Sequence, residues 1–586
     1  MVRFEKTPLF NSHNSEIRTF DFEAENWTKL RMAGLYNGIC YNQIYLEKNE
    51  SQEDLVNYVI SHMETQGGIW YAHYGGKYDL IFLISRLYER FNKTHILDII
   101  YINGKILSFK VKDKRKTLFE IRDSSGLINS SLDSACKSFN IKTKKLAEID
   151  RKNLFSKYDY ETLTKYLMHD CISLFEVLEE FKKSLEIKTL KLTIASTALA
   201  KFKEIEGKTF TKKYNLSYDR RDEFIRLGYS GGRCEIFKRY GKGLYYYDVK
   251  SMYPSVMYDN YFPSGKLIKT NRYMENYLGI YKIKFSVADT HIPLLWVKQN
   301  KKLYFPQGEK VIGWYYSPEI EQAYKSGYNI EILEGYYWEN KIKIFKSYIE
   351  KYYTIKENSK DAKKATAKLL LNSLYGKFGQ KETRQKFSFN KPSLQQLTLT
   401  PYVCDRLNNV ELFRCDETNK ADYILPQLAG FTTSYARVKL YNYMQKIGFS
   451  HIYYSDTDSI VSDVTTDTGH NLGDLELKDK LKEGVFLLPK IYSVINSEGE
   501  NYIRAKGFRI YDMNIDHEKM YNCLDFQYFK KYFTQEKERV ANFLEYFTRL
   551  DLNHFGETLI DKKSIKSEYS KRIICEDGVN TTPLVF

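Results

Sequence analysis

The stretch that most constrains the fold is an aromatic and β-branched run, His451–Val461, which two carboxylates interrupt. The run predicts two short strands that meet at a polar tip. Because side chains alternate along a strand, Asp456 and Asp458 can point to nearly the same place. Two like charges in an apolar setting are costly without a cation between them, and Mg²⁺ prefers such oxygen ligands. A polar β-turn without a ligand is the alternative that this stretch alone leaves open.

The size and composition of the chain indicate a multidomain protein with a polyanionic partner. At 586 residues it is too long for one core, and about three to five domains are expected. The 90 Lys and Arg against 74 Asp and Glu give a net charge of +16, which favours nucleic acid as the partner. Eight scattered cysteines without a Cys-x-x-Cys pair argue against a disulfide framework and a zinc ribbon. Without a signal peptide or an apolar run of about 18 residues, we expect a soluble, intracellular protein outside membranes.

Three segments of the first 170 residues carry carboxylates in expected regular elements. Asp21 and Glu23 alternate with Phe in a strand and share one face. Asp79 follows a Gly-Gly turn at the start of an apolar helix, and Tyr166 and Asp170 lie four residues apart on another helix. Each motif alone is ordinary, whether a solvated strand face, a helix N-cap or polar residues on a helix surface. Together they are the set that two-metal phosphodiester hydrolysis needs, with Tyr166 positioning the attacking water.

Further candidates follow in the middle of the chain. Gly228–Arg233 is a glycine-rich turn whose amides and Arg side chain suit a phosphate backbone, although a plain Gly-Gly hairpin explains it equally well. Asp248 ends an aromatic strand and would be buried against Tyr side chains unless it holds a cation. Residues 342–378 predict helix, and one face of it is polar. That face comprises Lys364, Lys368, Asn372 and Tyr375. It suits a triphosphate and a base, with a solvated basic face as the alternative.

In their order along the chain, these segments resemble the motifs of family B DNA polymerases. The resemblance is to the protein-primed branch of small linear-genome phages and linear plasmids. The polymerase-like motifs are Asp248–Ser255 (DxxSLYPS, with Met252 for Leu), Lys368–Gly376 (KxxxNSxYG) and Tyr454–Ser459 (YxDTDS). The exonuclease-like motifs are Phe20–Glu23, the segment around Asp79 and Tyr166–Asp170, followed by Tyr229–Gly232, which is similar to the YxGG link.

The resemblance implies a mixed α/β fold, with an RNase H-like 3′–5′ exonuclease domain followed by a right-hand polymerase with two insertions. The implied ranges are 1–190 for the exonuclease, 191–260 and 426–515 for the palm, 261–341 for insertion 1, 342–380 for the fingers, 381–425 for insertion 2 and 516–586 for the thumb. Insertion 1 would contact a terminal priming protein, and insertion 2 would encircle the template for strand displacement. From their residues, 261–345 predict short strands and the last seventy predict mainly helix.

The resemblance also implies the chemistry: DNA-directed synthesis from dNTPs on template-primer DNA, with 3′–5′ proofreading and Mg²⁺ or Mn²⁺ as cofactor. Asp248, Val249 and Asp458 would hold the polymerase metals, with Asp456 assisting. Asp21, Glu23 and Asp170 would hold those of the exonuclease, whose further catalytic residues are Asp79 and Tyr166. The residues implied for the nucleotide are Val249, Tyr253, Lys364, Lys368, Asn372 and Tyr375. Those implied for DNA are Tyr74, Ser131, Leu132, Tyr229, Gly231, Gly232, Arg233 and Lys506.

The chain departs from the family pattern at several positions. Tyr74 stands where the second exonuclease motif carries Asn, so we expect it to stack on a base instead. Ala24 replaces the usual Thr after the first motif. The primer-binding KxY motif is assigned to Lys506-Gly507-Phe508, which keeps the charge and loses the hydroxyl. The exonuclease lysine is either Lys144 or Lys145, because spacing does not choose between them.

Two alternative functions share these motifs: an inactive DNA-binding homologue, and a family B polymerase that uses an ordinary primer. The presence of all three polymerase carboxylates argues against inactivity. The sequence leaves the host, the compartment and the priming hydroxyl open.

Overall fold

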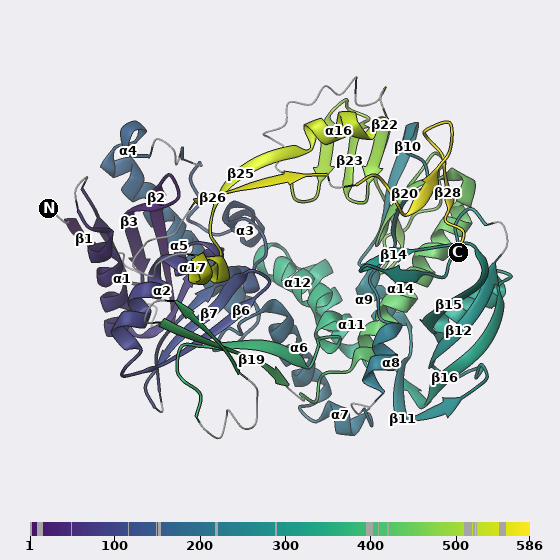
Figure 1. The fold of residues 1–586 in the computed structure, drawn as a ribbon, viewed down its shortest axis with the longest axis horizontal. Helices are drawn as coiled ribbons and strands as arrows, with labels where there is room; N and C mark the ends of the chain where they lie inside the picture. The colour runs from purple at the N-terminus through teal and green to yellow at the C-terminus, as the bar shows by residue number, and fades with distance from the viewer. Residues whose placement is uncertain are drawn as a thin grey trace.

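The structure is a computed structural model. It describes residues 3–586 apart from 9–15, 48–49, 115, 148, 151–153, 217–220, 288–289, 394–401, 408–409, 419–420, 509–518, 520–521, 523, 550–557 and 566. An N-terminal α/β body lies on one side, a body built on two further sheets lies on the other, and helices fill the space between them (Figure 1). No helix in the described part of the chain is long and apolar enough to cross a membrane.

The N-terminal body is built on a mixed sheet of eleven strands. In spatial order these are β1 (Arg3–Pro8), β4 (Cys40–Tyr45), β3 (Lys29–Tyr36), β2 (Ile17–Glu25), β5 (Gly68–Ala72), β8 (Thr117–Asp123), β7 (Lys105–Lys112), β6 (Ile96–Ile102), β17 (Thr383–Ser388), β19 (Val410–Thr418) and β18 (Tyr402–Leu407). The strand expected around Asp21 is β2, which runs antiparallel to β3 and parallel to β5.

Helices bury the apolar side chains of this sheet. They include α1 (Gln52–Gln66), α2 (Asp79–Phe91), α3 (Leu132–Phe139) and α5 (Tyr160–Ser184). Phe20 and Phe22 of β2 belong to the same core cluster as residues of α1 and α2. On β2, Thr19 donates a hydrogen bond to the carbonyl of Cys171 in α5, at 2.7 Å. The alternation of β2 therefore sends its Phe side chains into one core and turns Asp21 toward the opposite side of the strand.

Two segments from far along the chain attach to the edge of this sheet. β17 pairs with β6 through Phe387 and Ile99. The helix α17 (Phe543–Arg549) places Phe543 in the same core cluster as Phe387. Parts of the ranges expected as insertion 2 and thumb are therefore fixed to the N-terminal body. The described residues cover these ranges only in part, and the domain boundaries remain predictions.

The second body contains a seven-stranded antiparallel sheet. In spatial order its strands are β24 (Asn501–Ala505), β23 (Ile491–Asn496), β22 (Leu475–Leu488), β10 (Tyr240–Val249), β21 (Ser459–Ser462), β20 (Ile452–Asp456) and β9 (Cys234–Ile236). Tyr247 and Val249 of β10 pack in one cluster with side chains of α9 (Met252–Asp259) and α14 (Pro426–Ile447). The helix expected at 430–438 is part of α14.

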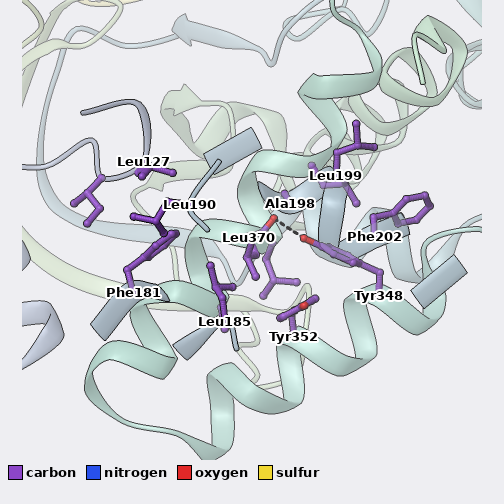
Figure 2. Packing of buried hydrophobic residues seen from close by; sticks show 14 of the residues in the cluster. Leu127, Phe181, Leu185, Leu190, Ala198, Leu199, Phe202, Tyr348, Tyr352 and Leu370 are labelled. Atoms are coloured by element: carbon purple, nitrogen blue, oxygen red, sulfur yellow. Dashed lines mark hydrogen bonds between the residues drawn. The ribbon is translucent and has the colours of Figure 1, made fainter. Parts of the chain in front are cut away.

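Helices between the two bodies share one continuous core. They include α6 (Ile194–Glu206), α11 (Lys346–Asn358) and α12 (Asp361–Phe378). Phe181 of α5, Phe202 of α6 and Leu370 of α12 belong to one cluster. Figure 2 shows Tyr348 of α11 pointing at Leu370, whose carbonyl accepts a 3.1 Å hydrogen bond from its hydroxyl. This packing connects the helix that carries the predicted nucleotide residues with the N-terminal body.

The range 261–341 is rich in strands, as expected. A four-stranded sheet contains β11 (Phe262–Thr270), β16 (Asn329–Ile342), β12 (Gly279–Val287) and β15 (Gly308–Tyr316), with α10 (Ser317–Lys325) beside it and the hairpin β13 (Val297–Gln299) and β14 (Lys302–Tyr304). The expectation of a mainly helical C-terminal part is wrong for the described residues. It contains the hairpins β25 (Thr534–Val540) with β26 (Thr558–Ser564) and β27 (Arg572–Ile574) with β28 (Thr581–Pro583), and α16 (Phe526–Tyr532) besides α17.

Candidate active sites

Three of the predicted exonuclease carboxylates converge. Asp21 and Glu23 on β2 and Asp170 on α5 each offer an oxygen, and these atoms all lie within 4.8 Å of one another. Glu23 and Asp170 are buried. The N-cap of α5 is Asp159, whose carboxylate accepts the Thr162 amide and sets where the helix starts. A buried set of oxygen donors that close together is suited to a hard divalent cation.

Asp79 lies beside this group. It is the first residue of α2, and the N-cap of that helix is Tyr78. Its Oδ1 accepts a 3.3 Å hydrogen bond from the amide of Phe22, which places the carboxylate against β2 between the two acidic positions of that strand. The preceding Gly-Gly turn makes the approach possible. A Cβ at Gly75 would lie 3.1 Å from Asp79 Oδ2, and one at Gly76 would lie 1.9 Å from the Ile106 carbonyl oxygen. The turn therefore requires glycine on steric grounds.

Of the two lysines predicted as alternatives for the exonuclease, Lys145 rather than Lys144 contacts one of these acids. Lys145 Nζ lies 2.7 Å from Asp170 Oδ2 and 5.3 Å from the centre of the Tyr166 ring. Burial alone would lower the pKa of this ammonium, but the charge of Asp170 and the nearby Tyr166 hydroxyl outweigh burial and hold the pKa above its ordinary value. Lys145 therefore stays charged and holds Asp170 through this ion pair.

A cavity of about 600 Å³ opens beside these carboxylates. Tyr74, Ser131 and Leu132, the residues predicted to hold single-stranded DNA, all line it together with Asp21 and Asp170. Tyr74 has a left-handed backbone (φ 59°), and its ring is 38% exposed. Ser131 also has a structural task, because its hydroxyl caps α3 by accepting the Ser134 amide. The cavity thus brings the predicted DNA residues to the predicted acids.

The sequence analysis missed His73, which lines the same cavity. Its ring nitrogens lie 2.8 Å from Ser124 Oγ and 2.8 Å from the Ser130 carbonyl oxygen. Burial lowers the pKa of His73 to about 4, so the ring is neutral at pH 7. Its position directly before Tyr74 is the signal that could have identified it.

In the second body, three neighbouring strands bring the polymerase-type carboxylates together. Asp248 on β10 and Asp456 on β20 both lie opposite Ser459 of β21. The tip of the β20–β21 hairpin has a left-handed Thr457 (φ 64°), and the amide of Val249 donates to the Asp458 carbonyl at 2.7 Å. The predicted hairpin is therefore correct, and it ends beside Asp248.

The electrostatics of these three acids are those of a site that attracts cations. Burial, with the negative charges of Asp248 and Asp456, raises the pKa of Asp458 to about 6. The pKa of Asp248 is also raised, mainly by burial, while the charges of Lys478 and Lys368 act against that rise. Because Lys368 lies on α12, the basic face of that helix contributes a positive potential at Asp248.

Asp456 has a protein cation of its own. Lys490, in the turn between β22 and β23, places Nζ 2.8 Å from both Asp456 oxygens, and its amide donates to the Tyr454 hydroxyl at 3.0 Å. The segment Lys490-Ile491-Tyr492 fits the KxY spacing with its hydroxyl retained. The assignment of that motif to Lys506-Gly507-Phe508 stays a prediction, and Lys490-Ile491-Tyr492 is a second candidate whose lysine reaches the acids. Lys506 is exposed, and its amide donates to the Lys490 carbonyl at 3.0 Å.

The predicted nucleotide face of α12 is present. Lys364, Lys368 and Asn372 are exposed, whereas Leu370 and Leu374 are buried on the opposite side. Further along the same face, the ring of Tyr375 stacks on that of Tyr253 from α9, with centroids 4.5 Å apart and planes 25° apart. The two aromatic residues predicted for the nucleotide therefore form one surface. Their roles toward a nucleotide remain predictions.

The glycine-rich turn supports the hairpin that carries Asp456 and Asp458, and the expected contact of Arg233 with DNA is wrong. Arg233 is 2% exposed, forms an ion pair with Glu235 at 2.6 Å and donates to the Pro293 carbonyl at 2.7 Å. A guanidinium buried in this way cannot reach a DNA backbone. The carbonyl of Arg233 instead accepts the Thr457 amide at 2.6 Å. At Gly232 a Cβ would lie 2.9 Å from Thr457 Cγ2, so this position must stay small.

The rest of that turn is held from α14. Arg437 donates to the carbonyls of Ser230 and Gly231 at 2.8 and 2.9 Å and pairs with buried Glu319. Tyr229 packs against Gly379, just beyond the end of α12. The backbone amides of the turn remain candidates for DNA contact, with Arg437 as the residue that sequence reasoning did not assign.

Comparison with known proteins agrees with the motifs and the site geometry. The sequence model of the family described as DNA polymerase type B, organellar and viral, matches residues 59–160 and 146–400. These matches cover more than half of the chain, and the chain belongs to this family. The resemblance to protein-primed family B DNA polymerases, drawn from the motifs, is confirmed.

Similar sequences come from fungi and from phages. A probable DNA polymerase of Podospora anserina is 28% identical over 66% of this chain and 36% of its own length. The DNA polymerase of Bacillus phage M2 is 27% identical over 60% of this chain and 62% of its own length. The chain spans 36% to 55% of the length of the probable DNA polymerases of Podospora anserina, Ascobolus immersus and Neurospora intermedia.

Among solved structures, phi29 DNA polymerase in complex with primer-template DNA and incoming nucleotides is similar. The TM-score is 0.72 at 21% identity, over 94% of this chain and all of that chain. This likeness shows that the chain has the fold of that polymerase, and the mixed α/β fold expected from the motifs is confirmed.

Proposed function

We propose that the protein is a DNA-directed DNA polymerase of the protein-primed family B type with a 3′–5′ proofreading exonuclease. The observation that carries the proposal is the meeting of Asp248 and Asp458 at neighbouring strand ends, next to the basic face of α12. A growing primer needs carboxylates for divalent cations and ammonium groups for a triphosphate in one place. Family membership supports the same activity.

Asp248 and Asp458 are the residues that would hold Mg²⁺ or Mn²⁺. Their fit rests on the chemistry of the donors: two carboxylates whose pKa values are raised by burial, without a lysine bound directly to either in the described structure. Divalent cations bound there, and at the exonuclease acids, would neutralise charge on the phosphate and activate the attacking oxygen. Asp456, paired with Lys490, shapes the field of the site.

The side chains around these acids would position the substrates. Lys364 and Lys368 bind the triphosphate of the incoming dNTP. Tyr253 lies under its sugar and excludes a 2′-hydroxyl, while Tyr375 stacked on it lines the new base pair. Lys490 and Lys506, which a backbone hydrogen bond of 3.0 Å joins, hold the primer backbone with salt-dependent affinity.

The exonuclease site would remove a mismatched 3′ end. The end enters the cavity lined by Tyr74, Ser131 and Leu132 and meets the acids there. Tyr74 stacks on a base, which an exposed ring in this position can do. Tyr166, close to Lys145, orients the attacking water.

Primer extension tests the proposal. Purified protein with a labelled primer-template, dNTPs and Mg²⁺ should extend the primer, and Asp458→Asn should not. Asp467→Asn is the matched control, because that carboxylate is 88% exposed and lies on the same segment. If the wild type binds the DNA and never extends it, the protein is the inactive DNA-binding homologue.

Protein priming and strand displacement are the finer parts of the proposal. Insertion 1 would contact the terminal protein and insertion 2 would encircle the template. Incubation with labelled dNTP, Mg²⁺ and the product of the neighbouring gene should attach a nucleotide covalently to that product. Normal primer extension without such attachment would assign the protein to the ordinarily primed branch.

A further inference from the structure

A carboxylate lies among the lysines next to the polymerase site. Glu357, in the last turn of α11, accepts from Lys250 Nζ at 3.1 Å through Oε2 and lies 3.3 Å from Lys356 Nζ through Oε1. Each carboxylate oxygen therefore contacts a different ammonium group. Lys250 follows Asp248 and Val249 in the same motif.

Other contacts fix the two lysines near the catalytic strand. Lys356 Nζ donates to Ser251 Oγ at 3.1 Å, and Lys250 Nζ donates to the His470 carbonyl at 2.8 Å. Ser251 has a left-handed backbone (φ 55°) where β10 passes into α9. Both ammonium groups therefore lie where the motif turns away from Asp248.

These lysines act with Lys368 as one positive cluster. Burial lowers the pKa of Lys356, and the charges of Lys250 and Lys368 lower it further. Ammonium groups that repel one another in this way form a site for an anion. In the structure the anion there is Glu357.

Two effects act against the negative charge of Glu357 at this position. A negative charge in the last turn of a helix opposes the helix dipole, and burial would raise the pKa of the carboxyl. The hydrogen bonds from Lys250 and Lys356 outweigh burial and lower the pKa of Glu357. The carboxylate is therefore ionised at pH 7 and depends on the two lysines.

We propose that Glu357 is an internal competitor for the phosphates of the incoming nucleotide; the inference rests on the proposed polymerase function. Without nucleotide, Glu357 neutralises Lys250 and Lys356. A triphosphate carries more negative charge than one carboxylate, takes both ammonium groups and displaces Glu357 toward solvent, to which its side chain is already 38% exposed. Its return helps pyrophosphate to leave.

Steady-state primer extension with Glu357→Gln tests this competition. The variant keeps the shape of the side chain and removes its charge, so the KM for dNTP should fall about two- to five-fold, as expected for a partly exposed ion pair. The inhibition constant of pyrophosphate should fall by a similar factor, without a gain in kcat. Glu350→Gln, an exposed position on α11, should match the wild type in both constants.

The outcomes separate the possible roles. A raised KM with a lowered kcat would mean that Glu357 only supports the helix, and an unchanged KM would also overturn the inference. A wild type that fails to extend the primer would instead overturn the proposed function itself. The inhibition constant of pyrophosphate does not depend on dNTP selection. It must fall together with the KM for dNTP, and a rise or no change would overturn the inference.

Discussion

The two carboxylate sites use the same parts in different arrangements. In the N-terminal body, Lys145 contacts Asp170, one of the three acids whose oxygens converge within 4.8 Å. In the second body, Lys490 contacts both oxygens of Asp456 and leaves Asp248 and Asp458 as the pair nearest the basic helix. In the N-terminal body the lysine thus contacts one of the predicted metal ligands, Asp170. In the second body it contacts Asp456, which is not one of the two predicted ligands. The difference predicts separable activities and unequal roles for the acids.

The largest effect is expected from the second body. Asp458→Asn should reduce primer extension by at least about a hundred-fold, because a carboxylate at the reacting centre is lost. The Asp458→Asn variant should still shorten a primer in the absence of dNTPs. The rates of primer extension and primer shortening on one labelled primer-template measure the two activities. An equal loss of both activities would show that the two sites are not separable.

The reverse experiment removes the converging acids. Asp21→Asn combined with Glu23→Gln should abolish 3′–5′ degradation and leave extension close to that of the wild type. The reason is that both side chains lie on β2, in a body separate from the polymerase acids. Quantified shortening of a mismatched primer is the measurement. Degradation that persists in the double variant would show that hydrolysis occurs elsewhere.

Smaller effects are expected from the two lysines that contact the acids, Lys145 and Lys490. Lys145→Met should slow degradation, and Lys490→Met should slow extension, each by about ten- to a hundred-fold, the usual range for residues that orient a metal ligand. Each should spare the other activity. Lys144→Met and the exposed Lys480→Met are the matched controls. If Lys145→Met slowed extension as much as degradation, the two sites would not be independent.

Of these features, the hairpin at 451–461, the strand with Asp21 and the polar helix face were predictable, because each is a periodic pattern within one segment. The role of Arg233 was not, since a local motif does not tell whether a side chain faces DNA or pairs with Glu235 in the core. The contact of Lys490 with Asp456 was not predictable, because the two residues are 34 positions apart in the sequence. The strands β25 and β26 were not predictable, because they are rich in charge and show little apolar alternation.

The smallest predicted effect concerns pH and the buried ring of His73. The pKa of His73 is about 4 in the folded protein against an ordinary 6.5, so between these values the unfolded chain binds a proton that the folded protein does not. The stability due to neutral His73 is complete above pH 6.5 and is lost as the pH falls toward 4. His73→Gln should therefore lose less Tm than the wild type between pH 7 and pH 4.5. His470→Gln, at an exposed position, should follow the wild type, and identical slopes for all three proteins would contradict the argument.

The unequal roles of the polymerase acids are tested most directly by cation binding. Mn²⁺ bound to the protein with primer-template DNA and a non-hydrolysable dNTP can be counted by electron paramagnetic resonance, with Asp21→Asn and Glu23→Gln present to remove the exonuclease site. Adding Asp458→Asn should abolish the remaining binding, whereas adding Asp456→Asn should preserve most of it, because Lys490 already neutralises Asp456. Equal loss of Mn²⁺ in the two variants would contradict this division between the acids.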